Sequence, residues 1–80
     1  MENIVSLLQA RGINCTVEYP EFIYIRLPDE SYWSFGLVNP TWCGDRTSRD
    51  GDELDCARSD LKPDAAPEVV ADFIFKTLNK

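Results

Sequence analysis

The chain has 80 residues, a length that suits one domain built around a single hydrophobic core. An apolar fraction of 44%, with four Phe, three Tyr and two Trp, excludes the disordered class of proteins. The formal net charge of −6 argues against direct binding of nucleic acid, because phosphate contacts need clustered Lys and Arg.

The sequence also lacks the usual signals for membranes, export and metals. It has no apolar run near ~18 residues, no lipidation motif and no polybasic stretch. Its first residues, MENIVSLLQARG, are too few and too polar for a signal peptide, so we expect a cytoplasmic protein. There is no histidine, and the three cysteines form no C-x-x-C motif, so we expect neither a structural metal nor another cofactor.

Residues 2–11 form the first predicted helix, because apolar residues recur at the spacing of one helical face. Gly12 follows as the residue that ends this helix, since glycine readily adopts the left-handed conformation typical of that position. Residues 13–19 then alternate between apolar and polar, which predicts a strand with one buried face. The inward positions of this strand are Ile13, Cys15, Val17 and Tyr19.

Two stronger strands follow, and together they predict a hairpin. Residues 22–27 and 32–38 both alternate, and the segment 28–31 between them begins with a proline, which is typical of a turn. A hairpin that buries one face is expected to oppose two apolar rows. These rows are Ile23, Ile25 and Leu27 on the first strand and Trp33, Phe35 and Leu37 on the second.

The next stretch is less regular. Residues 41–44 read as a short extended piece, and residues 45–52 form a polar segment whose Asp-Gly pair signals a turn. Residues 53–58 alternate again and predict a further strand. The inward side chains of that strand are Leu54 and Cys56.

The last predicted element is a second helix, for which Asp64 is the candidate N-cap and Pro67 lies in the first turn. Strands that follow one another through short turns predict an antiparallel meander. The fold class is therefore α+β, with residues 1–80 as a single domain. We expect an antiparallel β-meander of three to five strands, with an N-terminal and a C-terminal helix packed on one face.

Catalysis is not expected from this chain. Nucleophilic catalysis needs an activated nucleophile, most often beside a histidine base, and the sequence has no histidine. Its serines occur in no G-x-S-x-G elbow, and its four glycines are too scattered for a phosphate-binding loop. Acids crowd residues 45–55 without matching the EF-hand pattern, so an unspecific divalent-ion site there is one possible function.

Acidic residues form two predicted clusters that could meet a basic partner. The stretch 50–55 (DGDELD) has no base and holds the acids Asp50, Asp52, Glu53 and Asp55. On a strand, Glu53 and Asp55 would share one face about 6.8 Å apart and partly imitate the phosphates of duplex DNA. Nearby basic residues dilute this imitation: Arg46, Arg49, Arg58 and Lys62. The second predicted cluster comprises Glu18, Glu21, Asp29 and Glu30.

Three aromatic residues are candidate anchors for a partner protein. Tyr24 and Tyr32 alternate with the inward rows and should lie on the opposite face of the sheet, whereas Trp42 falls in the irregular stretch. Exposed aromatic side chains are frequent anchors at protein interfaces. Their neighbours here are acidic, so a protein partner is favoured over single-stranded nucleic acid.

The segment FIYIRLPDESYWSFGLVNPTWCGD, the acidic Asp-Gly turn and the helix PEVVADFIFKTL resemble small phage and mobile-element proteins. The matching positions are Leu27, Asp29, Gly36, Asn39, Trp42, Gly44, Asp45, Asp50, Gly51, Val70, Ala71 and Ile74. Several anti-CRISPR proteins are similar in size, acidity and two-layer architecture. The resemblance implies a function in a prokaryotic host cell, where such inhibitors bind a surveillance complex and block access of DNA or recruitment of a nuclease.

The favoured hypothesis is a stoichiometric inhibitor that occupies a basic nucleic-acid-binding surface, such as that of a CRISPR effector complex. Both acidic clusters would supply electrostatic contacts, and the three aromatic residues would anchor the complex. The alternative is a non-inhibitory interaction module or accessory subunit, dimeric through an exposed strand edge. A monomer is favoured, with no membrane and no nucleic acid as a direct partner.

Overall fold

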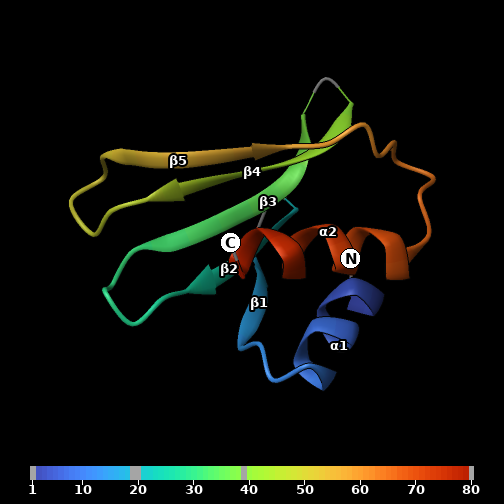
Figure 1. The fold of residues 1–80 in the computed structure, drawn as a ribbon, viewed down its shortest axis with the longest axis horizontal. Helices are drawn as coiled ribbons and strands as arrows, with labels where there is room; N and C mark the ends of the chain where they lie inside the picture. The colour runs from blue at the N-terminus through green and yellow to red at the C-terminus, as the bar shows by residue number, and fades with distance from the viewer. Residues whose placement is uncertain (1, 19–20, 39, 80) are drawn as a thin grey trace.

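The computed structural model of the protein describes residues 2–18, 21–38 and 40–79. The fold consists of a five-stranded sheet with one helix before it and one after it in the sequence (Figure 1). Each strand pairs antiparallel with its neighbours in chain order. The elements are α1 (Glu2–Ala10), β1 (Cys15–Glu18), β2 (Phe22–Arg26), β3 (Tyr32–Val38), β4 (Thr41–Thr47), β5 (Glu53–Arg58) and α2 (Pro67–Leu78). The predicted α+β meander with its two terminal helices is therefore confirmed.

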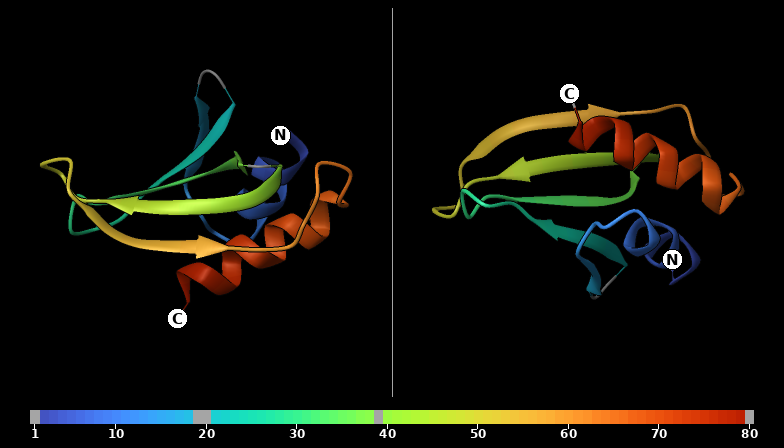
Figure 2. Two further views of the ribbon diagram at one scale, coloured as in Figure 1. Left: turned by 90° about the horizontal axis from the view of Figure 1, so that it is seen from above. Right: turned by 60° about the horizontal axis from the view of Figure 1, so that its bottom comes forward.

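The two helices pack against each other and cover one face of the sheet, which we call the core face (Figure 2). Strand pairing brings the predicted inward rows together, since Ile23 lies opposite Phe35 and Ile25 opposite Trp33. All four side chains are buried. The Phe35 ring stacks on Trp33 at 5.4 Å between centroids and meets the edge of Phe73, from α2, at 5.9 Å. Aromatic packing thus joins the middle of the sheet to the C-terminal helix.

The hairpins β2–β3 and β4–β5 close with the same three-residue turn. Glu30 N–H donates to the Leu27 carbonyl at 3.0 Å, and Gly51 N–H donates to the Ser48 carbonyl at the same distance. In both turns the third residue is left-handed, with φ of 70° at Glu30 and 94° at Gly51. Both predicted turns are confirmed, and Gly12 at the end of α1 has the expected left-handed φ of 82°.

The prediction for the region after β3 was partly wrong. Strand β4 does not stop at Gly44 but continues to Thr47, because Asp45 pairs with Ser34 on one side and Cys56 on the other. On β5 the predicted inward residues, Leu54 and Cys56, are exposed. The register with β4 instead turns Ala57 inward, opposite Gly44, and leaves Leu54 as the extra residue of a β-bulge.

Smaller differences concern the ends of elements. Val17 and Leu37 were predicted to face inward, but 42% and 39% of their surfaces are exposed to solvent, because both residues lie towards the ends of their strands. Tyr19 lies outside the described residues. The N-cap of α2 is Ala66, not Asp64, and its side chain makes no capping bond. Pro67 takes the first helical position, and a residue before proline is restricted to the extended conformation that a cap requires.

Candidate functional site

The predicted second acidic cluster does not exist as one group. Asp29 and Glu30 lie in the β2–β3 turn, whereas Glu18 and Glu21 lie beside the β1–β2 connection, at the other end of β2. β2 separates the two pairs, and at about 3.4 Å per residue its five residues span roughly 17 Å. This spacing exceeds the Debye length of about 8–10 Å at physiological ionic strength, so the two pairs act separately.

The two acids of the β2–β3 turn are bound by arginines of the neighbouring hairpin. Arg46 on β4 donates from Nη2 to Asp29 Oδ2 at 2.6 Å, and Arg49 in the β4–β5 turn donates from Nη1 to Glu30 Oε2 at 2.7 Å. Arg46 Nε also donates to the hydroxyl of Ser31 at 3.1 Å. These arginines are two of the residues expected to dilute the acidic tract, and their guanidinium groups are engaged elsewhere.

Asp29 is held as a carboxylate by its surroundings. The hydroxyl and the backbone N–H of Ser31 both donate to Oδ1, at 2.5 Å and 3.0 Å. These bonds, with the positive charge of Arg46 as a further cause, hold the pKa of Asp29 below its usual value. Ser31 itself is 2% exposed, so this network ties the turn to buried structure. A structural role explains Asp29 without any partner.

The first predicted cluster is arranged differently. We call the hairpin end that carries Asp50, Asp52, Glu53 and Asp55 the acidic arm. All four residues are exposed, and none of them forms an ion pair with a described Lys or Arg. Asp29, Glu30 and Asp72, by contrast, are each paired. The arm therefore presents charge that the protein leaves uncompensated.

The predicted carboxylate row on one face of β5 was wrong. Because of the bulge, Asp55 lies opposite Arg46 and Glu53 lies opposite Thr47. Arg46 and Thr47 are consecutive on β4, and consecutive strand residues point to opposite faces of the sheet. The register thus directs Glu53 and Asp55 to the two sides of the edge strand. A partner that reaches the edge of the sheet can meet both carboxylates.

Strand β5 forms one edge of the sheet but is poorly suited to pair with another strand. Its bulge at Leu54 distorts the edge, and its exposed acids would face the charges of an identical strand. The Cys56 amide donates to the protein's own Asp55 Oδ1 at 2.8 Å. Bulges and charged side chains are devices by which natural sheets avoid edge pairing. The outer side of β5 is therefore better fitted for electrostatic contact than for strand addition.

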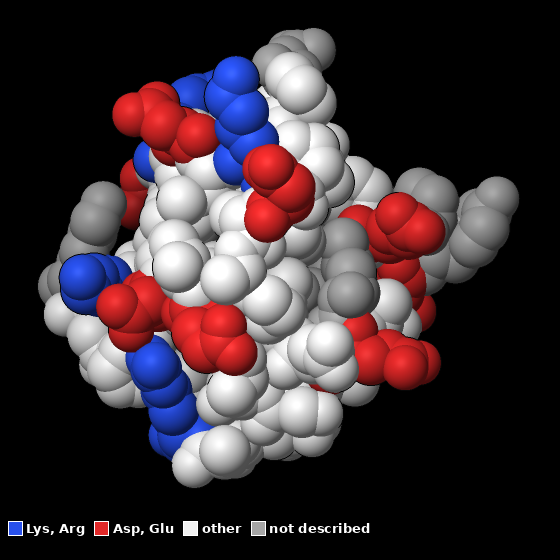
Figure 3. Space-filling model, turned by 90° about the vertical axis from the view of Figure 1, so that its right-hand side faces the viewer, with Lys and Arg blue, Asp and Glu red and all other residues white. Residues whose placement is uncertain are grey.

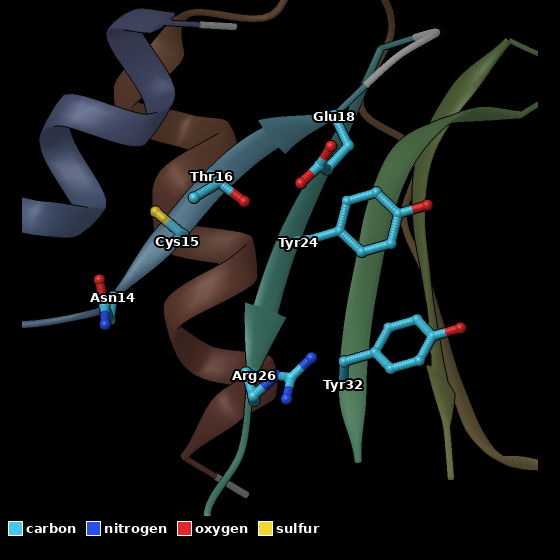
Figure 4. Close-up of a pocket in the computed structure, with 7 residues that line it drawn as sticks. All are labelled: Asn14, Cys15, Thr16, Glu18, Tyr24, Arg26 and Tyr32. Atoms are coloured by element: carbon cyan, nitrogen blue, oxygen red, sulfur yellow. The ribbon is translucent and has the colours of Figure 1, made fainter. Parts of the chain in front are cut away.

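The face of the sheet away from the helices, the open face, carries the two tyrosines as predicted. Tyr24 and Tyr32 stand on neighbouring strands with ring centroids 5.7 Å apart and a tilt of 40°. They border a groove of about 600 Å³ whose other lining side chains include Thr16, Glu18 and Arg26 (Figure 4). Sequence reasoning placed Arg26 on the same face as Tyr24 but did not include it, or Thr16, among the binding residues. The alternation in FIYIR was the available signal.

Trp42 does not serve as an exposed anchor, because it is 4% exposed and belongs to the core. Its backbone N–H donates to the Leu61 carbonyl at 2.8 Å, and its carbonyl accepts from the Ser59 hydroxyl at 2.6 Å. The chain after β5 thus continues along β4 and closes over this residue. The indole Nε1 is buried and has no hydrogen-bond partner among the described residues.

Acidic charge also occurs away from the arm. On the face shown in Figure 3, some acidic side chains lie beside Lys or Arg, while others gather towards one side with no basic neighbour in view. Near the start of α1, Glu2 and Glu21 border a shallow depression with the half-exposed Val17. Negative charge alone therefore does not distinguish the acidic arm from the rest of the surface. Its distinction is that four unpaired acids are gathered on one protruding hairpin.

Within residues 2–18, 21–38 and 40–79, no three Asp, Glu or Cys side chains converge in a group that could hold a metal ion. In the same part of the chain, no helix is long and apolar enough to cross a membrane. Comparisons with models of protein families, with curated proteins and with solved structures give no match for this chain.

Proposed function

We propose that this protein is a stoichiometric inhibitor of the anti-CRISPR kind, acting in the cytoplasm of a prokaryotic host cell. Its acidic arm occupies the basic nucleic-acid-binding surface of a CRISPR effector complex or of similar nuclease machinery, and no catalytic step is involved. The observation that carries the proposal is the uncompensated charge of Asp50, Asp52, Glu53 and Asp55, which form no ion pair with described residues.

The internal ion pairs give this observation its weight. Arg46 and Arg49 are close in sequence to the arm, yet their guanidinium groups bind Asp29 and Glu30. A carboxylate whose charge is already offset by an arginine attracts a further cation less strongly than an unpaired carboxylate does. The arm therefore offers a basic surface four unpaired carboxylates gathered on one hairpin, and their combined charge would also steer its approach.

The alternative, a non-inhibitory interaction module that dimerises through a sheet edge, has less support at β5. The bulge, the acids and the Cys56–Asp55 hydrogen bond all oppose the addition of a strand there. Contacts through exposed charge weaken when salt is added, but main-chain pairing between strands depends little on it. Salt dependence therefore separates the two functions.

The test compares two charge-reversed variants of equal net charge. Glu53→Lys with Asp55→Lys alters the arm, and Asp60→Lys with Asp64→Lys alters exposed acids in the β5–α2 connection. Each reversal adds two positive units, so both variants change the formal charge from −6 to −2. The immobilised wild-type protein and both variants are exposed to prokaryotic lysate at low salt and at about 500 mM salt.

We expect the wild-type protein and the Asp60/Asp64 variant to capture a nucleic-acid-binding complex at low salt only. The arm variant should lose it. The captured complex is then tested for DNA binding, which the wild-type protein should block in proportion to its concentration. Three results would contradict the proposal. The complex could stay bound at about 500 mM salt, the arm variant could capture it as well as the wild-type protein does, or the protein could bind only further copies of itself.

A further inference from the structure

The groove on the open face has ends of opposite charge. Glu18 lies at one end and Arg26 at the other; Tyr24 lies between them on β2, and Tyr32 lies opposite Arg26 on β3 (Figure 4). Glu18 lies opposite Phe22 on β2, and Arg26 follows Phe22 by four residues. At about 3.4 Å per residue, the two charged positions are separated by roughly 13–14 Å along the strands.

Neither charge is neutralised by the rest of the described chain. Among the described residues Glu18 and Arg26 form no ion pair, although the protein has an excess of acids that could bind an arginine. Tyr24 and Tyr32 are both half-buried, so part of each side chain remains exposed to solvent. Among the described residues, the arginine that stacks on an aromatic ring is Arg11, which lies over Phe75 of α2. Arg26 does not stack on Tyr24 or Tyr32, so the faces of these rings stay open.

The alternation of charge restricts what can fill the groove. A nucleic-acid strand would place a phosphate against Glu18, and a polybasic segment would place a cation against Arg26. An extended peptide can satisfy both ends, because residues i and i+4 of an extended chain point the same way and lie about 13–14 Å apart. Residue i+2 then falls midway, over Tyr24, whose ring centroid lies 5.7 Å from that of Tyr32, so an aromatic or aliphatic side chain gains contact there.

We propose that the groove binds an extended segment of a partner protein that carries a basic and an acidic side chain four residues apart. The basic side chain pairs with Glu18, the acidic one with Arg26, and the residue between them packs on Tyr24 and Tyr32. The groove volume of about 600 Å³ is within the range of sites for ligands of this size. This surface is separate from the acidic arm, so the proposal does not depend on the function proposed above.

Synthetic pentapeptides test the charge pattern directly. The probes are acetyl-Lys-Gly-Phe-Gly-Glu-amide and two counterparts that carry Lys at both ends or Glu at both ends. Binding is followed by chemical-shift titration of the folded protein, since the amides of the groove report the site as well as the affinity. Each correct pair of exposed charges should contribute about 2- to 5-fold in affinity, so the Lys/Glu peptide should bind the wild-type protein best.

Two single variants provide the decisive comparison. Arg26→Glu gives the groove two acidic ends and should transfer the preference to the Lys/Lys peptide. Glu18→Lys gives it two basic ends and should transfer the preference to the Glu/Glu peptide. Both side chains are exposed, so the fold should persist, and the unchanged spectrum of core residues verifies this.

Several outcomes would overturn the proposal. One is the absence of shifts at the groove with all three peptides, and another is a preference that fails to follow the reversed charges. Shifts at the same residues on dilution of the protein alone would assign the groove to a second copy of the chain. The variant with lysine substitutions at Glu53 and Asp55 should bind the Lys/Glu peptide normally, so the arm and the groove can fail independently.

Discussion

A matched pair of glycine substitutions compares how tightly the core face and the open face of the sheet are packed. Gly44 and Gly36 both lie in the interior of strands, and each stands beneath an aromatic ring. A Cβ at Gly44 would lie 2.5 Å from Cδ1 and 3.0 Å from Cζ of Phe35. A Cβ at Gly36 would lie 2.5 Å from Cδ1 and 2.6 Å from Cε1 of Phe22. Because carbon atoms prefer about 3.5–4.0 Å, either ring must move by roughly 1 Å.

The two rings differ in their freedom to move. Phe35 is 0% exposed and held between Trp33 and Phe73, so Gly44→Ala should incur overpacking of about 2–3 kcal/mol. Phe22 is half-buried on the open face and can turn outwards, so the same change at Gly36 should cost less than about 1 kcal/mol. Alanine in a strand also stabilises the folded state by about 0.5–1 kcal/mol relative to glycine, and this gain offsets part of the cost at both sites.

The expected net effect is therefore a destabilisation of about 2 kcal/mol for Gly44→Ala and close to none for Gly36→Ala. For a domain of this size, about 2 kcal/mol lowers Tm by roughly 8–16 °C. Urea unfolding followed by tryptophan fluorescence measures both variants, since Trp33 and Trp42 are buried in the folded state.

Equal destabilisation by the two alanines would refute the reasoning, because the overlap distances are alike and only the mobility of the ring differs. A double-mutant cycle identifies the ring concerned. In a Phe35→Val background the Gly44→Ala penalty should fall by at least about 1 kcal/mol, since the overlapping Cδ1, Cε1 and Cζ atoms are gone. Additive effects would show that Phe35 is not the obstacle.

Three further predictions concern acid stability, helix capping and thiol exposure. The pKa of Asp29 lies below its unfolded value, so its stabilising effect is present above that value and lost as pH falls through the folded pKa. Asp29→Asn should therefore reduce the loss in urea midpoint between about pH 6 and pH 3, and an equal loss in both proteins would count against the turn network. Ala66→Asp should raise stability by about 1 kcal/mol by supplying the missing cap of α2, as measured by Tm; no gain would contradict this account. Cys56 should react with a thiol reagent in the folded protein, whereas Cys15, whose pKa is raised by burial, should react only on unfolding; loss of the fast phase in Cys56→Ser is the check.

Much of the fold could be predicted from local pattern. The 2-residue alternation of β2 and β3 predicted the buried rows, which the register of Ile23 with Phe35 confirms. Proline and the Asp-Gly pair located the turns, because their backbone preferences act within a few residues. Alternation likewise placed Tyr24 and Tyr32 on the open face, where they border the groove.

Strand β5 shows where local pattern failed. Leu54 and Cys56 are its most apolar residues, and alternation alone predicted that they face inward. The orientation of an edge strand depends on its register with its single neighbour, and a bulge shifts that register by one residue. Opposite Gly44 there is room for Ala57, and the bulge leaves Leu54 exposed.

The pairing of charges also depended on tertiary structure. The sequence showed that Asp29, Glu30, Arg46 and Arg49 exist but not that they meet, since the partners are 17 and 19 residues apart. Only the antiparallel arrangement of two hairpins brings their turns together. The free charge of the acidic arm follows from this pairing.

Composition and periodicity by themselves determined the fold class, the strand order and the acidic character of this protein, because propensity and hydrophobic pattern are local properties. Tertiary structure decided that Trp42 is buried, that Arg26 and Glu18 define a groove with the two tyrosines, and that the four acids of the acidic arm form no ion pair with described residues. These features depend on contacts between residues distant in the chain, and such contacts are set by the register and packing of the whole sheet.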